Sequence, residues 1–239
     1  MDKDIQFEDR AVAFIDILGF KYFVCEAASH NNRLTELQEL VNTLEMALPD
    51  LNASISSDVN PALIPEHLYI SDCLIISAPL YSGDTKQYDG LASVVMRVIQ
   101  VAHMLLEKGY LIRGGIDVGP LWHTRKNVAG VAYQKAYELE TKTSCPRVEL
   151  SPKAQDHWKN HKFFKDSNMC IDYRDAFMVN TLFADVSGYM SSHFKSIEDG
   201  YQAYSEIINE KIQSTTMESA RYKWWWLNEY ISNYMKDDQ

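Results

Sequence analysis

The chain has 239 residues, of which 46% are hydrophobic and 23% charged, and its formal net charge is −10. This length and composition are ordinary for one globular domain, or for one domain with an appendage. Nucleic acids are held mainly by clustered Lys and Arg, so the acidic balance argues against a nucleic-acid binder. A small polyanionic ligand stays possible if bound cations neutralise it locally.

Neither a membrane segment nor a disulfide framework is indicated. No apolar run approaches the roughly 20 residues that a membrane span needs, and the N-terminal MDKDIQFEDR lacks the apolar stretch of a signal peptide. The four cysteines are dispersed without a CxxC pair, which is typical of reduced cytosolic thiols. We therefore expect a cytoplasmic protein that makes no contact with membranes.

The N-terminal third predicts a strand, a helical segment and a hairpin. Residues 11–17 form a short apolar run that indicates a buried strand. Apolar residues then recur every three or four positions over 19–48, which is typical of a helix. After a polar loop, residues 66–78 predict two strands joined by a tight turn at Ser71 and Asp72.

A second helix and a third strand follow the hairpin. The periodic apolar residues of 91–106 predict a helix that ends at Gly109. Residues 111–119, LIRGGIDVG, predict the next strand. The resulting order βαββαβ predicts an α+β fold with a ferredoxin-like sheet and helices on one face.

Further elements follow this core. Residues 130–142 predict a helix and 147–150 a short strand. The tail from about 176 is predicted to be helical. Its three consecutive tryptophans, 224–226, cannot all face one way, so we expect them to pack this segment on the domain or on a partner chain. We therefore expect a catalytic domain over 1–175 and a helical extension over 176–239.

Two aspartates lie inside apolar strand segments. Asp16 is within AVAFIDILGF, and Asp72 is within HLYISDCLIIS. A carboxylate in a strand core is costly unless a partner or a metal compensates it. If the two strands are neighbours, both carboxylates converge on one point. Metal binding is then favoured over purely structural carboxylates, and phosphoryl chemistry is the leading hypothesis, because Mg²⁺ and Mn²⁺ prefer oxygen ligands together with substrate phosphates.

Arg113 lies in an otherwise apolar strand and needs an anionic partner. It could contact a substrate phosphate or base, or it could pair with a buried carboxylate such as Asp117 or Glu140. The sequence leaves these alternatives open. The adjacent Gly114 and Gly115 predict a close backbone approach, at a dimer seam or beneath a ligand.

Five motifs together resemble those of the class III nucleotide cyclases. They are FIDILGF (14–20), ISD (70–72), LIRGGIDVG (111–119), GVAYQKAYELE (130–140) and PRVELSP (146–152). The resemblance covers about 11–152. Within that family the chain looks most like the bacterial pyrimidine cyclases of Pycsar anti-phage defence, which share a compact cyclase domain and a C-terminal helical extension with a similar aromatic end.

The resemblance implies a two-metal site for Mn²⁺ or Mg²⁺. Asp16 and Asp72 would hold the metal ions, and the carbonyl of Ile17 would be an additional ligand. Gly19 and Phe20 would begin a helix whose backbone N–H groups and dipole hold the triphosphate.

The departures from purine cyclases concern the base and the transition state. Purine cyclases carry Asn and Arg on the motif helix, where this chain has Gln134 and Glu138. Gln134 can still donate a hydrogen bond, whereas Glu138 cannot stabilise an anion. Leu68 replaces the adenine-reading lysine, Tyr69 beside it could contact a smaller base, and Asn127 replaces the base-reading aspartate. These changes argue against an adenylate cyclase.

The resemblance thus implies a homodimeric cyclase that converts UTP or CTP into the cyclic monophosphate, with UTP favoured over CTP. Arg113 and Gln134 are the proposed catalytic residues. Tyr69 would come from the metal-holding subunit, whereas Asn127, Tyr133 and Gln134 would reach in from the other. A cyclic-nucleotide-responsive effector would act downstream.

The alternatives are a non-catalytic cyclase-homology module that dimerises or senses a ligand, and a cyclase of other base specificity. A diguanylate cyclase is disfavoured, because the hairpin reads YISDC instead of a GGDEF-type turn.

Overall fold

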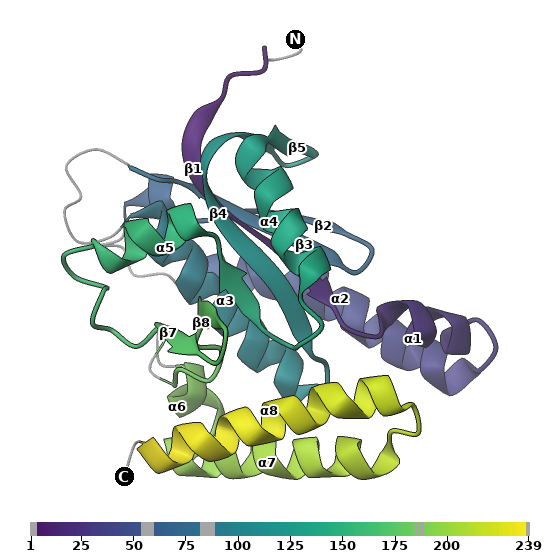
Figure 1. Cartoon of the computed structure of the whole chain (residues 1–239). Coiled ribbons are helices and arrows are strands. Elements are labelled where there is room, and N and C mark those ends of the chain that lie inside the picture. The colour runs from purple at the N-terminus through teal and green to yellow at the C-terminus, as the bar shows by residue number, and fades with distance from the viewer. Residues whose placement is uncertain (1–3, 54–59, 82–88, 185, 187–188, 238–239) are drawn as a thin grey trace.

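The computed structural model describes residues 4–53, 60–81, 89–184, 186 and 189–237 (Figure 1). Within these residues an eight-stranded sheet has the order β2-β3-β1-β4-β6-β8-β7, and β5 pairs with β4. The strands are β1 (Glu8–Ile17), β2 (Glu66–Ile70), β3 (Cys73–Pro79), β4 (Ile112–Thr124), β5 (Asn127–Gly130), β6 (Val148–Leu150), β7 (Cys170–Tyr173) and β8 (Ala176–Val179).

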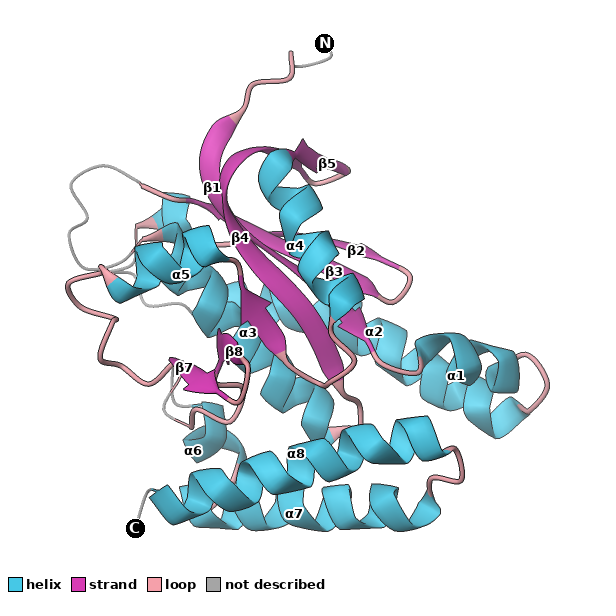
Figure 2. Cartoon of the chain, in the orientation of Figure 1, coloured by secondary structure: helices cyan, strands magenta, loops and turns pink. Residues whose placement is uncertain are grey.

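Helices cover both faces of the sheet (Figure 2). They are α1 (Phe20–Ala27), α2 (Asn31–Ala53), α3 (Gly90–Glu107), α4 (Val131–Lys142), α5 (Pro152–Lys159), α6 (Tyr189–His193), α7 (Ile197–Ser214) and α8 (Glu218–Asp237), with a 3₁₀ turn at Pro61–Leu63. The predicted βαββαβ order is present from β1 to β4, so the α+β prediction is confirmed.

The alternation of side chains along β1 separates the two faces. Ala11, Ala13, Ile15 and Ile17 join the large core cluster that contains α3 and parts of α1 and α2. The predicted single face for the helices of the βαββαβ core is therefore confirmed. Val12 and Phe14 point the other way and pack against α4, which covers the opposite face.

Gly115 allows α4 to lie close to the sheet. A Cβ atom at this position would lie 2.3 Å from the carbonyl oxygen of Ala136 on α4. Similarly, a Cβ atom at Gly114 would lie 2.4 Å from the carbonyl oxygen of Phe14 on β1. The predicted close backbone approach is thus present, and it is made by elements of the same chain.

The central helix of the main core is α3. Among the described residues, α3 is the one helix that is long and apolar enough to cross a membrane, with a mean hydropathy of 1.3. However, 89% of this segment is buried inside the fold. Burial of this extent is typical of a core helix.

The C-terminal region differs from the sequence prediction at its start. Residues 176–179 were expected to be helical, but they form β8, which pairs with β7 and with β6. The expected boundary between 175 and 176 lies in the β7–β8 turn, where Arg174 has a left-handed φ of 55°. The helical part begins at α6, and α7 and α8 lie side by side as a hairpin against the domain (Figures 1 and 2).

The tryptophans of α8 anchor this hairpin. Trp224 and Trp226 are 7% and 2% exposed, whereas Trp225 is 59% exposed, so the three side chains do not share one face. The ring of Trp226 lies 5.6 Å from that of Tyr173 on β7. Trp224 and Trp226 therefore pack the hairpin on the domain of their own chain.

Candidate functional site

Strand register brings three polar side chains into one row. Asp16 on β1 is paired with Cys73 on β3 and with Arg113 on β4. All three lie on the face that α4 covers, because Asp16 continues the alternation of Val12 and Phe14.

The hairpin turn adds Asp72 to this row. Ser71 adopts a left-handed φ of 60°, which allows the tight turn between β2 and β3. The backbone N–H of Ile17 donates to the carbonyl of Asp72 over 3.0 Å, which ties the end of β1 to this turn.

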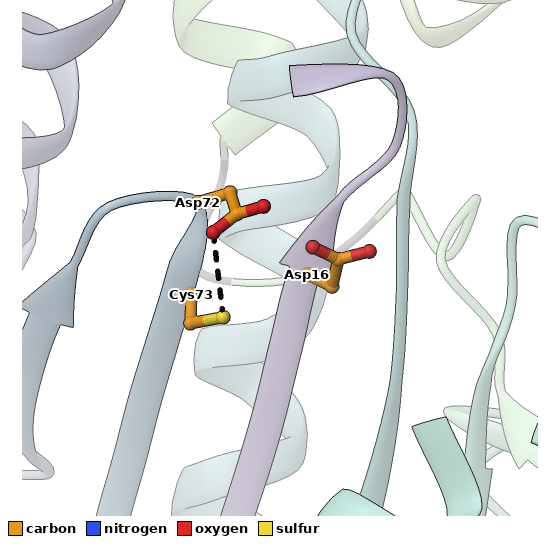
Figure 3. Close-up of side chains that lie close together, drawn as sticks. All are labelled: Asp16, Asp72 and Cys73. Carbon is orange, nitrogen blue, oxygen red and sulfur yellow. Dashed lines mark hydrogen bonds between the residues drawn. The ribbon is translucent and has the colours of Figure 1, made fainter. Parts of the chain in front are cut away.

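Asp16, Asp72 and Cys73 form a compact cluster (Figure 3). One potential ligand atom from each lies within 4.8 Å of the others. The thiol of Cys73 lies 3.7 Å from Oδ1 of Asp72. The structure thus brings the two predicted aspartates together and adds a thiol that the sequence reasoning missed.

Arg113 is engaged by partners from its own chain. Its Nε donates to Oδ2 of Asp16 over 3.0 Å, and its Nη2 lies 2.7 Å from Oε1 of Glu140. Its Nη1 donates to the carbonyl of Thr143 over 3.1 Å. Of the alternatives that the sequence left open, pairing with Glu140 is present. Asp117 is not the partner, since it accepts a hydrogen bond from Ser151.

Acidic groups outnumber basic groups in this cluster. Burial raises the pKa of Asp16 against the opposing effect of Arg113, and the nearby Asp72 raises it further. Burial also raises the pKa of Glu140, although Arg113 opposes the shift. Burial, followed by Asp72 and Asp16, raises the pKa of Cys73 to about 12, so the thiol is protonated at neutral pH.

This donor set fits a divalent cation. Asp16 and Glu140 contact the guanidinium of Arg113, and Asp72 lies close enough to raise the pKa of both of these carboxyls, so a cation would offset the remaining negative charge. Carboxylate oxygens suit Mg²⁺ and Mn²⁺, and the thiol adds a softer donor.

The residues predicted beside the metal lie on the β1–α1 connection. Gly19 has a φ of 84° and is the N-cap of α1, and it lacks a side chain that could cap the helix. The side chains of Ile17 and Phe20 are 3% and 8% exposed and belong to the main core. Any contact of these residues with a ligand therefore has to come from their backbone.

The two tyrosines predicted to bind substrate, Tyr69 and Tyr133, lie near the cluster of their own chain, since Cys73 contributes to the pKa shift of both. Tyr69 on β2 is half-buried, and burial raises its pKa, with further effects from Glu45, Asp72 and Cys73. Tyr133 on α4 is also half-buried, and its ring lies 5.9 Å from that of Phe14.

The other two predicted substrate contacts are exposed. Asn127 begins β5, and its Oδ1 accepts a hydrogen bond from the N–H of Val128 over 2.9 Å. Gln134 lies on the exposed side of α4. One turn further along, Glu138 pairs with Lys135 over 2.7 Å.

Lys223 is a further polar residue that the sequence reasoning missed. It lies on α8 and is half-buried. Burial lowers its pKa, Arg113 lowers it further, and Asp16 acts in the opposite direction. The C-terminal helix α8 therefore brings a cation near Asp16, and no motif in the sequence indicates that Lys223 lies close to this aspartate.

Comparisons with known proteins find similarity only at the level of structure. No protein-family model matches the chain, and no curated protein matches it. The solved structures similar to this chain include the catalytic core of a rhodopsin-guanylyl cyclase with converted specificity in complex with ATPαS. That likeness has a TM-score of 0.48 at 14% identity, and it covers 74% of this chain and 95% of that one.

A second similar structure is a class III adenylyl cyclase-like ATP-binding protein from Pseudomonas aeruginosa. The TM-score is 0.42 at 17% identity, and the match covers 65% of this chain but only 37% of that chain. At these identities the likeness concerns the fold.

Proposed function

We propose that the chain is a nucleotidyl cyclase that converts UTP or CTP into the 3′,5′-cyclic monophosphate and pyrophosphate. The observation that carries this proposal is the cluster in which ligand atoms of Asp16, Asp72 and Cys73 lie within 4.8 Å of one another. It lies at the ends of paired strands and beside the N-terminus of a helix.

In this reaction the ribose 3′-oxygen bonds to the α-phosphorus, and the bond from that phosphorus to the pyrophosphate oxygen breaks. The hydroxyl proton is lost to solvent or a base. Divalent ions bound by Asp16 and Asp72 would supply charge stabilisation for both the attacking and the leaving oxygens. The carboxylates of the chain hold that charge in place and orient the two oxygens.

The main role of Arg113 in this reaction would be to orient the Asp16 carboxylate. Its guanidinium contacts Asp16, Glu140 and the carbonyl of Thr143, so it fixes the direction of the Asp16 carboxylate. Contact between Arg113 and a substrate phosphate would use one of its two remaining N–H donors or replace one of these partners. Gln134 stays the proposed hydrogen-bond donor to ribose or phosphate.

We propose a homodimer in which Asn127, Tyr133 and Gln134 complete the site of the partner subunit. Apolar exposure on the α4 side supports an interface there. Val131 and Tyr137 on α4 are 60% and 48% exposed.

The finer parts of the proposal depend on the resemblance in sequence motifs. Tyr69 and Asn127 would select a pyrimidine, with UTP favoured over CTP. Mn²⁺ or Mg²⁺ would be the metal. By the same resemblance the enzyme would act in the cytoplasm in anti-phage defence, and its product would activate a separate cyclic-nucleotide-responsive effector.

Incubation of the purified protein with each of the four nucleoside triphosphates and Mn²⁺ or Mg²⁺, followed by mass spectrometry, tests this function. We expect a cyclic pyrimidine nucleotide from the wild type and none from Asp72→Ala. ATP or GTP as the best substrate would show that the base assignment is wrong. If no triphosphate yields a cyclic product, the chain is instead a non-catalytic module of the same fold.

A further inference from the structure

A cleft of about 860 Å³ adjoins the aspartate cluster. Its walls come from three parts of the chain: residues 17–20 after β1, residues 108–111 between α3 and β4, and residues of the α7–α8 hairpin between 210 and 224. The cleft therefore begins directly after Asp16 and extends toward the C-terminal helices. Its volume is within the range of small-molecule sites.

Three lysines from three different elements line this cleft. Lys108 follows α3, Lys211 lies on α7 and Lys223 lies on α8. Within the described part of the chain, none of the three has a carboxylate at ion-pair distance. Their charges are therefore available to an anionic ligand.

The cleft also contains Arg33 and four glutamates. Arg33 is paired with Glu26 over 3.4 Å and with Glu36 over 2.7 Å. Glu39 and Glu210 also line the cleft. Arg33 thus already engages two of the glutamates, and an anion in the cleft would contact the three lysines.

The position of Lys223 is fixed by its neighbours on α8. The adjacent Trp224 is buried in the main core, and Trp226 and Leu227 one turn away are buried as well. Because this side of α8 is packed, Lys223 is held between the core and the cleft. Its pKa responds to both Arg113 and Asp16, so the three charges are close in space.

Lys211 is held against the backbone of the α3–β4 turn. A Cβ atom at Gly109 would lie 2.5 Å from Cε and 2.9 Å from Nζ of Lys211. Gly109 has a left-handed φ of 75°, which ends α3 and leaves room for the lysine. The ammonium of Lys211 thus lies at the cleft wall next to Lys108.

We propose that the C-terminal hairpin supplies the polyphosphate site of this protein, with Lys223 as its central cation and Lys211 and Lys108 beside it. These lysines would bind the β- and γ-phosphates of the nucleotide and then the pyrophosphate. This inference rests on the proposed cyclase function, because it assigns the part of the same site that faces away from the aspartates. A polyphosphate bridging the metal site and this cleft would neutralise charges on both sides.

Calorimetric titration with inorganic tripolyphosphate in the presence of Mg²⁺ tests the site without any turnover. We expect Lys223→Met to weaken binding by about tenfold or more, since the lost contact is charge-assisted. Lys211→Met should weaken it less, and Lys223→Arg should retain most of the affinity. Arg221→Met is the matched control, because Arg221 is an exposed cation on the same helix outside the cleft.

Kinetics then distinguish ligand binding from a structural role of Lys223. We expect Lys223→Met to raise KM for the nucleotide and the inhibition constant of pyrophosphate, with a smaller change in kcat. Unchanged tripolyphosphate affinity in Lys223→Met and Lys211→Met would overturn the inference, even if the wild type cyclises a nucleotide. Conversely, a loss of affinity limited to the cleft variants would support the inference even if no triphosphate is cyclised.

Discussion

Asp72→Ala is the sharpest test of the metal site, because the structure separates the role of Asp72 from that of Asp16. Both carboxylates belong to one cluster, but only Asp16 is also an ion-pair partner, with Arg113 at 3.0 Å. Among the described residues Asp72 forms no ion pair, and its side chain lies beside the thiol of Cys73, at 3.7 Å, and beside the Asp16 carboxyl.

The two substitutions should therefore differ in stability but not in activity. Loss of a carboxylate that binds the catalytic metal should cost several kcal/mol of barrier, or roughly 10³-fold in rate, for either variant. Asp72→Ala should change the free energy of unfolding by only about 0.5 kcal/mol, since it removes no ion pair and relieves repulsion with Asp16. Asp16→Ala should cost roughly 1–3 kcal/mol, because the partly buried Arg113 loses a charged partner.

The assay combines quantification of cyclic product with chemical denaturation of the metal-free protein. Mn²⁺ binding, followed by electron paramagnetic resonance, supplies a readout that does not depend on turnover. Near-normal turnover in Asp72→Ala would refute the metal assignment. Equal destabilisation by both substitutions would refute the separation of roles described here.

Three further predictions concern the base, the packing of α4 and the response to acid. Asn127→Ala should lower kcat/KM for the preferred pyrimidine triphosphate by about 1–3 kcal/mol, measured against the other triphosphates. Gly115→Ala should lower the free energy of unfolding by roughly 1–3 kcal/mol, because its Cβ would meet the Ala136 carbonyl; unchanged denaturation would contradict this packing. Burial lowers the pKa of His103 and of His123 to about 4. Protonation of these histidines therefore favours the unfolded state. The free energy of unfolding should be highest above about pH 6.5 and should fall toward pH 4, by on the order of 3 kcal/mol for each histidine. In denaturation experiments at several pH values, His103→Gln should show a smaller fall than the wild type.

The βαββαβ core could be predicted because its elements are long and strongly periodic. The run of apolar residues in 91–106 predicts a helix, and Gly109 does adopt the left-handed conformation that ends it. In contrast, β7 and β8 have four residues each and follow no turn dipeptide of glycine or proline. They pair mainly with each other across a tight turn, and β8 joins the sheet through one residue pair with β6. They were missed because strands this short give little periodic signal and are stabilised by the sheet that they join.

The residues of the candidate site also fall into two groups, those that the sequence identifies and those that only the folded structure brings to the site. Asp16 and Asp72 could be identified because a carboxylate inside an apolar strand contradicts its surroundings. Cys73 gave no such signal, since a cysteine suits a buried strand. Glu140 was considered as one of two partners for Arg113, and only the packing of α4 on the sheet decides between them. Lys223 depends on where α8 docks, which no local pattern encodes.

The row formed by Cys73, Asp16 and Arg113 also affects how the sheet can assemble. Side chains alternate along β1, so a slip of one residue against β3 and β4 would turn Asp16 toward α3. There the carboxylate would meet only apolar side chains of the main core and would lose Arg113. Burial of an unpaired charge is costly enough to exclude that misaligned sheet. The aspartate near the end of an apolar strand thus makes one strand alignment far more favourable than its neighbours.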